Sequence, residues 1–272
     1  MPRPPRLHLA GSTALLTGAT GGIGNAIARA LSARGVRLVL SGRREAELSQ
    51  IAEEVGAQAV VSDLAVAADV DRLAAAALDA EVDVLVANAA HPGTGMLAAL
   101  TQEEVDLILD VNLRAPIELA RILAPAMLAR GRGHLVFISS LSGKSAQPAS
   151  SLYSATKFGL RGFGLALRED LRGTGVGASV VAPGFIRDAG MFVRTGTKLP
   201  PGVGTRTPQD VAAAVIKAID DNRAEIDVAP LGLRVGSAIA SAVPGPAGWV
   251  SSKLGAGRIA TEMDAGHRRP TN

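Results

Sequence analysis

The single tyrosine of the chain, Tyr153, lies four residues before Lys157 and thirteen residues after Ser140. If this segment is helical, Tyr153 and Lys157 share one face, one turn apart. A nearby ammonium favours the phenolate, so it lowers the pKa of the phenol from its usual value of about 10. The pair predicts a proton donor and acceptor usable near neutral pH, whereas the simpler alternative is a half-buried Tyr beside a solvated Lys.

The opening of the chain carries a second pattern, an apolar strand followed by a glycine-rich turn and a helix. Residues 14–17 form the strand, Gly18, Gly22 and Gly24 follow, and apolar residues then recur at helical spacing. Free amides and the helix dipole attract a phosphate, and glycine lets the backbone approach it closely. The turn predicts a nucleotide site, although its spacing Gly-x-x-x-Gly-x-Gly differs from Gly-x-Gly-x-x-Gly. A purely structural glycine turn is the alternative.

With Asn88-Ala89, Asn112 and Pro183-Gly184, these motifs resemble the classical short-chain dehydrogenase/reductase (SDR) family over about residues 10–230. The resemblance implies hydride transfer between a nicotinamide and a small-molecule carbonyl or secondary alcohol. It assigns catalysis to four residues: Asn112, which holds a relay water, Ser140, which polarises the carbonyl, Tyr153, the general acid/base, and Lys157, which also binds the nicotinamide ribose. Ser139 is the alternative to Ser140.

The same resemblance implies a set of cofactor-binding residues. Asn88 would lie near the ribose, and Asp63 would accept from the adenine amino group unless it only caps the following helix. The full set is Gly18, Thr20, Gly22, Ile23, Gly24, Arg43, Asp63, Leu64, Asn88, Tyr153, Lys157, Pro183, Gly184 and Ile186.

The end of the second predicted strand favours NADP(H) over NAD(H). Proteins that select NAD carry an Asp or Glu there, but this chain has Ser41-Gly42 followed by Arg43 and Arg44. A guanidinium can bind the 2′-phosphate bidentately, and arginine is unfavourable as a mere helix start. Arg43 is the expected main contact.

Two positions depart from the family pattern. Ala87-Asn88-Ala89-Ala90 stands where the family has Asn-Asn-Ala-Gly, and Asp188 stands where Pro-Gly-x-x-x-Thr ends in Thr. An ionised Asp can accept from the nicotinamide amide but cannot donate to it. Ser154-x-x-Lys157 also matches a serine acylase motif, but the Ser-Asp-Asn and Lys-Thr-Gly motifs of that family are absent. The other alternative is a non-catalytic NADP(H)-binding sensor or assembly subunit.

The alternation of patterns along the chain predicts a Rossmann-type, doubly wound parallel sheet flanked by helices. Pro116 and Pro125 should kink or divide the fourth helix, and Thr101 and Thr207 should cap helices. Strands are expected at 13–17, 36–41, 58–62, 82–87, 134–139, 176–181 and 225–229, and helices at 22–34, 44–55, 67–79, 101–129, 151–172 and 208–222.

Composition excludes several functions. The chain has no cysteine and four scattered histidines, so neither a disulfide framework nor a metal site is expected. A net charge of +3 and 3% aromatic residues argue against a nucleic-acid surface. The N-terminus lacks the apolar core of a signal peptide, and prolines, glycines and serines interrupt the longest uncharged stretch. We therefore expect a cytoplasmic protein without a stable membrane span.

The last residues form an extension beyond the family pattern. We expect one domain over residues 1–230 and a helical extension, 231–272, that belongs to it or forms a lid or interface. Apolar residues at 231, 235, 239 and 243 make one helical stripe, which predicts a homo-oligomer, dimer or tetramer. A tail folded on its own subunit is the alternative, and membrane-surface binding is weaker because the stripe lacks a flanking Lys/Arg face. The apolar segment 185–201 suggests a lipophilic ketone or 3-oxoacyl substrate.

Overall fold

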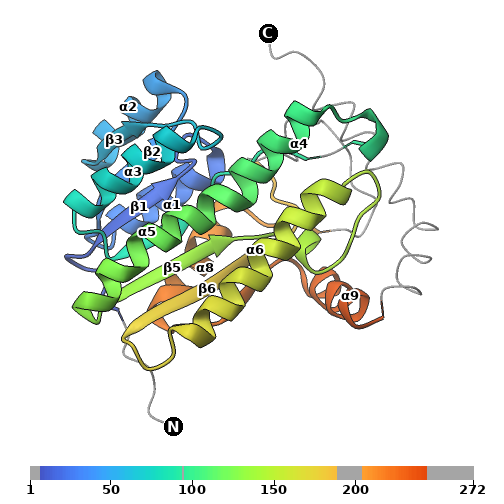
Figure 1. Ribbon diagram of the computed structural model, residues 1–272. Helices are drawn as coiled ribbons and strands as arrows, with labels where there is room; N and C mark the ends of the chain where they lie inside the picture. The colour runs from blue at the N-terminus through green and yellow to red at the C-terminus, as the bar shows by residue number, and fades with distance from the viewer. Residues whose placement is uncertain (1–6, 94, 189–203, 244–272) are drawn as a thin grey trace.

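The computed structural model describes residues 7–93, 95–188 and 204–243, and it places a single parallel sheet of seven strands at the centre (Figure 1). The strand order is β3-β2-β1-β4-β5-β6-β7, and every neighbouring pair is parallel. The strands are β1 (Thr13–Thr17), β2 (Arg37–Gly42), β3 (Gln58–Val61), β4 (Val84–Ala87), β5 (Gly133–Ile138), β6 (Val176–Pro183) and β7 (Glu225–Val228).

Helices cover both faces of the sheet, as predicted. Successive residues of a strand point to opposite faces, so Leu16 of β1 joins one apolar layer and Leu15 joins the other. The first layer packs under α1, α2 and α8, and the second under α3, α5 and α6. The helices are α1 (Gly22–Ser32), α2 (Glu45–Val55), α3 (Ala67–Asp79), α4 (Gln102–Leu109), α5 (Ala115–Arg130), α6 (Ser151–Asp170), α8 (Pro208–Asp220) and α9 (Leu231–Ala242).

The strand order reverses beside β1, which pairs with β2 on one side and β4 on the other. Loops that leave β1 and β4 therefore diverge and open a crevice at the carboxyl ends of these strands. Within the described residues, no group of His, Cys, Asp or Glu could hold a metal, and no helix is long and apolar enough to cross a membrane.

The predicted helix over 101–129 is divided into three segments. α4 is followed by the π-helical segment η2 (Asp110–Arg114) and then by α5. The division falls just before Pro116, which occupies the first turn of α5. Pro125 lies inside α5 without ending it, since the helix continues to Arg130. Both predicted caps are confirmed: Thr101 and Thr207 each form a capping box.

Helix α9 follows β7 and presents its apolar stripe to solvent. Exposure of the four predicted stripe residues runs from 47% at Val243 to 70% at Leu231. Within the described residues, the stripe is therefore not folded against its own subunit. The remaining residues of the extension lie outside the described part of the chain.

Candidate active site

The glycine turn between β1 and α1 is built so tightly that side chains are excluded. A Cβ on Gly24 would lie 2.2 Å from the Gly18 carbonyl oxygen. Gly18 itself has a φ of +67°, and its Cβ would come within 2.8 Å of the Ala89 Cα. Positive φ and such close backbone contacts both require glycine. The turn brings the start of α1 against the end of β4.

Asn88 and Thr17 hold this turn in place. The Thr17 hydroxyl accepts hydrogen bonds from the backbone amides of Asn88 and Ala89, both at 3.1 Å. The Asn88 side-chain amide donates to the carbonyls of Thr17 and Gly18, at 3.0 and 3.2 Å. Asn88 therefore holds the glycine turn between β1 and α1 in place. Its expected role near a ribose stays a prediction.

A cavity of about 280 Å³ opens at the carboxyl ends of β1, β2 and β4. It gathers most of the predicted cofactor residues, but Ser140, Tyr153, Lys157, Pro183, Gly184 and Ile186 do not line it. Its lining is Gly18, Thr20, Gly21, Gly22, Ile23, Gly24, Ser41, Gly42, Arg43, Arg44, Ser62, Asp63, Leu64, Asn88, Ala89, Ala90, His91 and Val111.

The two arginines of the cavity differ in their partners. Arg44 donates to the Thr20 carbonyl at 2.7 Å and pairs with Glu47, so it ties the glycine turn to the start of α2. Arg43 is exposed and has a distant partner, with its Nη1 3.8 Å from an oxygen of Asp63. The buried Ser41 hydroxyl has no hydrogen-bond partner within the described residues. An unsatisfied hydroxyl and a loosely held guanidinium fit a phosphate-bearing ligand at this end of the cavity.

Asp63 does not cap a helix, so that alternative is wrong. Helix α3 begins after Val66 without a side-chain cap. Asp63 instead accepts from the Ala65 amide at 3.0 Å, in a local turn. This turn leaves the Asp63 carboxylate at the cavity wall, opposite Arg43.

The predicted catalytic set comes together where β5 ends and α6 begins. Ser140 follows β5, and the hydroxyls of Ser140 and Tyr153 are hydrogen bonded. Lys157 Nζ lies 5.7 Å from the centroid of the Tyr153 ring and donates to the Ile138 carbonyl at 2.9 Å. Ser139 is turned away, since its hydroxyl donates to the Lys157 carbonyl at 2.9 Å. The geometry therefore favours Ser140 over Ser139 as the partner of Tyr153.

Burial dominates the electrostatics of this set. Desolvation raises the pKa of Tyr153 to about 12, opposed by the hydrogen bond with Ser140. Desolvation also lowers the pKa of the buried Lys157 to about 8. The expected lowering of the Tyr153 pKa by Lys157 is therefore not found, because burial disfavours the charged forms of both groups. Tyr153 is a protonated phenol here, suited to donating a proton.

Asn112 lies at the centre of the π segment and is fully buried. Its side-chain oxygen accepts from the His91 amide at 2.6 Å, and its nitrogen donates to the His91 carbonyl at 2.9 Å. These two hydrogen bonds to the His91 backbone hold the loop after β4. They explain why Asn112, a poor helix former, occupies the helix. The relay water that Asn112 is expected to hold stays a prediction.

The remaining predicted residues lie along the loop after β6. Pro183 ends that strand, and the Gly184 amide donates to the Val228 carbonyl at 3.0 Å. Ile186 is buried and bridges to Arg206. Asp188 is exposed with a φ of +68°, and its expected nicotinamide contact stays a prediction. Most of segment 185–201, with its proposed lipophilic side chains, lies outside the described residues.

Ser154 offers little support for an acylase. Its hydroxyl is buried without a hydrogen-bond partner among the described residues, and the Lys157 ammonium binds the Ile138 carbonyl instead. A serine nucleophile needs a base within hydrogen-bond reach.

Sequence reasoning missed the roles of His91 and Arg44, because their contacts involve backbone carbonyls and amides that no side-chain motif records.

The sequence is similar to those of known proteins. A family model described as short chain dehydrogenase matches residues 12–199. The chain is 39% identical to the ketoacyl reductase HetN of Nostoc sp. over 227 residues, 81% of this chain and 79% of that protein. It is 33% identical to dehydrogenase/reductase SDR family member 7B of Xenopus tropicalis over 248 residues, 82% of this chain and 79% of that protein.

Solved structures are similar to this chain in fold and in sequence. A metagenomic short-chain oxidoreductase in complex with NADP is 34% identical, with a TM-score of 0.71 over 82% of this chain and 98% of the other. A short-chain dehydrogenase from Streptomyces avermitilis is 26% identical, with a TM-score of 0.76 over 90% of this chain and 98% of the other.

Proposed function

The chain belongs to the short-chain dehydrogenase/reductase family, and we propose that it is an NADP(H)-dependent oxidoreductase acting on a carbonyl or secondary alcohol. The observation that carries this proposal is the hydrogen-bonded Ser140–Tyr153 pair with the Lys157 ammonium beside the ring. A bound nicotinamide would supply or accept the hydride.

Tyr153, Lys157 and Ser140 have different roles in proton transfer and in orienting the carbonyl oxygen. In the reductive direction, the Tyr153 hydroxyl donates its proton to the oxygen that becomes the alcohol, and the resulting phenolate is stabilised by the nearby Lys157. The Ser140 hydroxyl donates a hydrogen bond to the same oxygen, which orients the carbonyl. In the oxidative direction, Tyr153 accepts the alcohol proton.

Preference for NADP(H) rests on the cavity end formed by β2. Among the described residues, the Ser41 hydroxyl has no partner, and the exposed Arg43 guanidinium has a carboxylate partner only at 3.8 Å. Both suit a 2′-phosphate, and the Asp63 carboxylate at the cavity wall has acceptor capacity for an adenine amino group. The NADP complex of a 34% identical structural relative supports the same preference.

The substrate class that we favour is a lipophilic ketone or a 3-oxoacyl compound. The name of the relative HetN, a ketoacyl reductase, supports the second. A sensor or assembly subunit that binds NADP(H) without turnover is the competing function. Turnover distinguishes them, because the sensor binds NADPH but does not consume it with any substrate.

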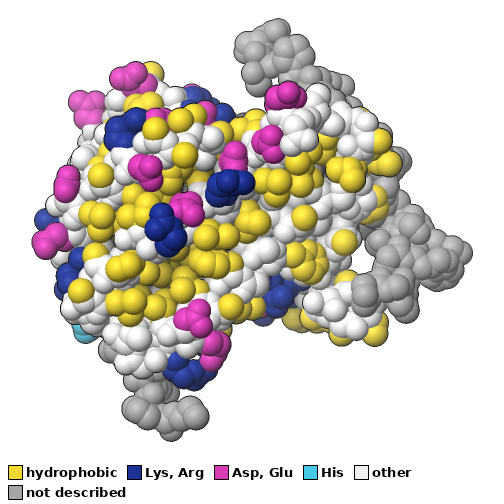
Figure 2. Space-filling model, in the orientation of Figure 1, with side chains coloured by type: hydrophobic (Ala, Val, Ile, Leu, Met, Phe, Trp, Pro, Cys, Tyr) yellow, Lys and Arg dark blue, Asp and Glu magenta, His cyan; other side chains and the backbone are white. Residues whose placement is uncertain are grey.

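A homo-oligomer, dimer or tetramer, is part of the same proposal. Figure 2 shows apolar side chains gathered between scattered charges on the face formed by α5 and α6. Leu128 and Phe158, from these two helices, are each 40% exposed. Such a surface supports burial against a second copy.

The test is NADPH oxidation with three substrate classes: 3-oxoacyl thioesters, steroids and small ketones. Tyr153→Phe should lower turnover by about 100- to 10,000-fold, because the ring remains but the transferable proton is lost. NADPH affinity should stay within a few-fold. Phe158→Leu, one turn further along α6, is the matched control and should retain turnover. Full activity of Tyr153→Phe would remove the tyrosine from the mechanism, and NADPH binding without any oxidation would favour the sensor.

A further inference from the structure

Helix α9 presents an apolar stripe that the described part of the chain leaves uncovered. Leu231, Val235, Ile239 and Val243 lie along one side and are 70%, 50%, 55% and 47% exposed. The residue that α9 buries is Ser237, whose position on the helix lies away from the stripe. Monomeric proteins rarely leave such a continuous apolar row in water, so the stripe indicates a binding surface.

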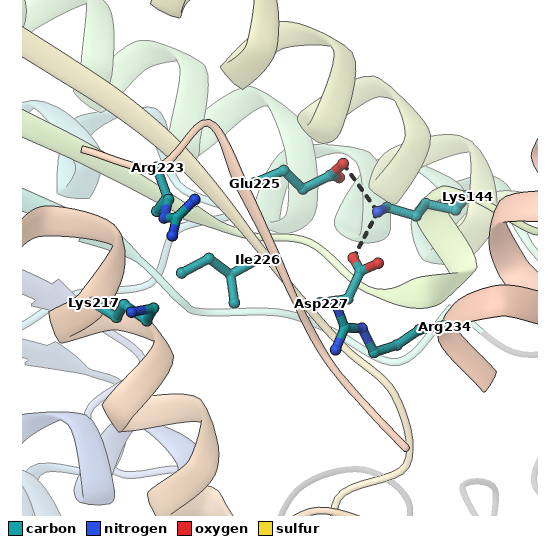
Figure 3. Close-up of a pocket in the computed structure, with 7 residues that line it drawn as sticks. All are labelled: Lys144, Lys217, Arg223, Glu225, Ile226, Asp227 and Arg234. Atoms are coloured by element: carbon teal, nitrogen blue, oxygen red, sulfur yellow. Dashed lines mark hydrogen bonds and ion pairs between the residues drawn. The ribbon is translucent and has the colours of Figure 1, made fainter. Parts of the chain in front are cut away.

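Basic residues from distant parts of the sequence gather beside this helix. A cavity of about 320 Å³ lies against the edge strand β7, and it is lined by Lys144, Lys217, Arg223, Glu225, Ile226, Asp227 and Arg234. Figure 3 shows Arg234 reaching in from α9, while Lys217 and Arg223 lie on the other side of β7 with Ile226. Arg234 therefore belongs both to the cavity and to the helix that carries the stripe.

The acidic residues of the cavity are largely occupied. Lys144 is buried and pairs with Glu225 and Asp227, at 2.9 and 2.6 Å, as the dashed lines in Figure 3 mark. Glu225 also accepts from Arg161 at 2.6 Å. These contacts neutralise the carboxylates on the inner side of the cavity.

The cations on the outer side are less completely balanced. Lys217 and Arg223 share one carboxylate, Asp221, at 3.0 and 3.8 Å, and both side chains are more than half exposed. Arg234 has no carboxylate within ion-pair distance among the described residues. Arg234 therefore adds positive charge on α9 itself, and Lys217 and Arg223 add exposed positive charge in the same cavity, across β7 from the helix (Figure 3).

We propose that this surface, the α9 stripe with Lys217, Arg223 and Arg234, binds the protein peripherally to membranes that contain anionic phospholipids. The stripe would enter the boundary between headgroups and acyl chains, and the three cations would contact lipid phosphates. A second copy of the chain fits less well, because a two-fold contact places each patch against itself and brings cations together. An anionic bilayer complements both parts of the surface.

Vesicle co-sedimentation of the full chain tests the proposal. The wild-type protein should sediment with phosphatidylcholine vesicles containing about one third phosphatidylglycerol, and not with pure phosphatidylcholine, since attraction to anionic lipid is required. Because each basic residue contributes ~1 kcal/mol near such a surface, the triple change of Lys217, Arg223 and Arg234 to Gln should lower partitioning by about 100-fold. Val235→Asp with Ile239→Asp should abolish it.

Matched variants control for charge and exposure. Changing Arg29, Arg121 and Arg172 to Gln removes the same charge from exposed sites on α1, on α5 and just after α6. Met96→Asp with Leu97→Asp changes two residues that are 67% and 61% exposed, on a different surface. Both controls should sediment like wild type. Thermal unfolding close to wild type for every variant would show that the fold is retained.

Three results would overturn the proposal. One is wild-type protein that does not sediment with anionic vesicles at low ionic strength. Another is equal loss of sedimentation in the Arg29, Arg121 and Arg172 control. The third is a halved mass of the Val235→Asp with Ile239→Asp variant in light scattering without vesicles, which would assign the stripe to a second copy. None of these outcomes depends on turnover, so the proposed enzyme activity stands or falls separately.

Discussion

His134 is a buried histidine that the proposed chemistry does not use, and it makes the stability of the protein sensitive to acid. It lies in β5, is 2% exposed, and its Nε2 is 2.8 Å from the Ser179 hydroxyl. That hydroxyl donates to the Arg223 carbonyl at 2.5 Å, so it accepts from His134. The hydrogen bond therefore requires a proton on Nε2, and it is the burial of His134 that disfavours a second proton on the ring.

The size of the effect follows from the pKa. Desolvation, and then the charge of Arg168, lower the pKa of His134 from 6.5 to about 3. Between these values the unfolded chain binds a proton that the folded protein does not, so stability falls as pH falls below 6.5. The loss is ~1.4 kcal/mol per pH unit, which gives roughly 2 kcal/mol at pH 5 and approaches 5 kcal/mol near pH 3.

Urea unfolding of wild type and His134→Gln measures this contribution. Glutamine can still donate to the Ser179 hydroxyl but does not titrate. The free energy of unfolding should drop between pH 7 and pH 5 by about 2 kcal/mol more in wild type than in the variant. Acidic groups with lowered pKa, such as Asp69 and Asp210, are common to both proteins and cancel in this difference. Protein concentration is kept fixed, because assembly changes apparent stability.

Parallel pH dependences of the two proteins would refute the reasoning. They would mean that water reaches His134, or that the imidazole is protonated in the folded state without cost. His8→Gln, which changes an exposed histidine, is the control and should follow wild type.

Three further predictions concern the cofactor, the loop after β4 and the extension. Arg43→Ala should weaken NADPH binding by about 10- to 100-fold, as for a lost charged hydrogen bond, and leave NADH binding nearly unchanged in a fluorescence titration; equal losses would remove Arg43 from the 2′-phosphate site. Asn112→Ala should lower the free energy of urea unfolding by about 1–3 kcal/mol, because it strips the backbone amide and carbonyl of His91 of their partner, and should lower kcat; unchanged values for both would contradict that role. Deleting residues 231–272 should abolish sedimentation with anionic vesicles and leave the mass measured by light scattering unchanged; a halved mass or a changed substrate KM would instead make the extension an interface or a lid.

The comparison of sequence and structure shows which signals are local. Every predicted strand is present within a few residues, because a buried parallel strand needs a continuous apolar run that the chain itself displays. The two capping boxes were equally readable, since Thr101 and Thr207 each act on a residue three positions away. Pro125 does not divide the helix, because α5 continues through it, and a kink there stays a prediction.

The order of motifs along the chain also determined the family, the crevice and the identity of the proposed catalytic residues. Ser140, Tyr153 and Lys157 could be found because one helix sets their spacing and one strand end supplies the serine. The direction in which the Tyr153 pKa shifts could not be found from the sequence. It depends on how many atoms from other elements exclude water around the ring.

Tertiary structure alone decided the environment of each site. Asn112 bonds to His91, twenty-one positions away, and the packing around β2 leaves the Ser41 hydroxyl without a hydrogen-bond partner in the part of the chain that the structure describes. The apolar stripe of α9 was visible in the sequence, but the basic residues near the helix were not. Lys217 and Arg223 share a cavity with Arg234 of α9 only because α8 and β7 fold beside that helix. Periodicity records the neighbours of a residue along one element, whereas charge and solvent depend on neighbours that the fold brings from elsewhere.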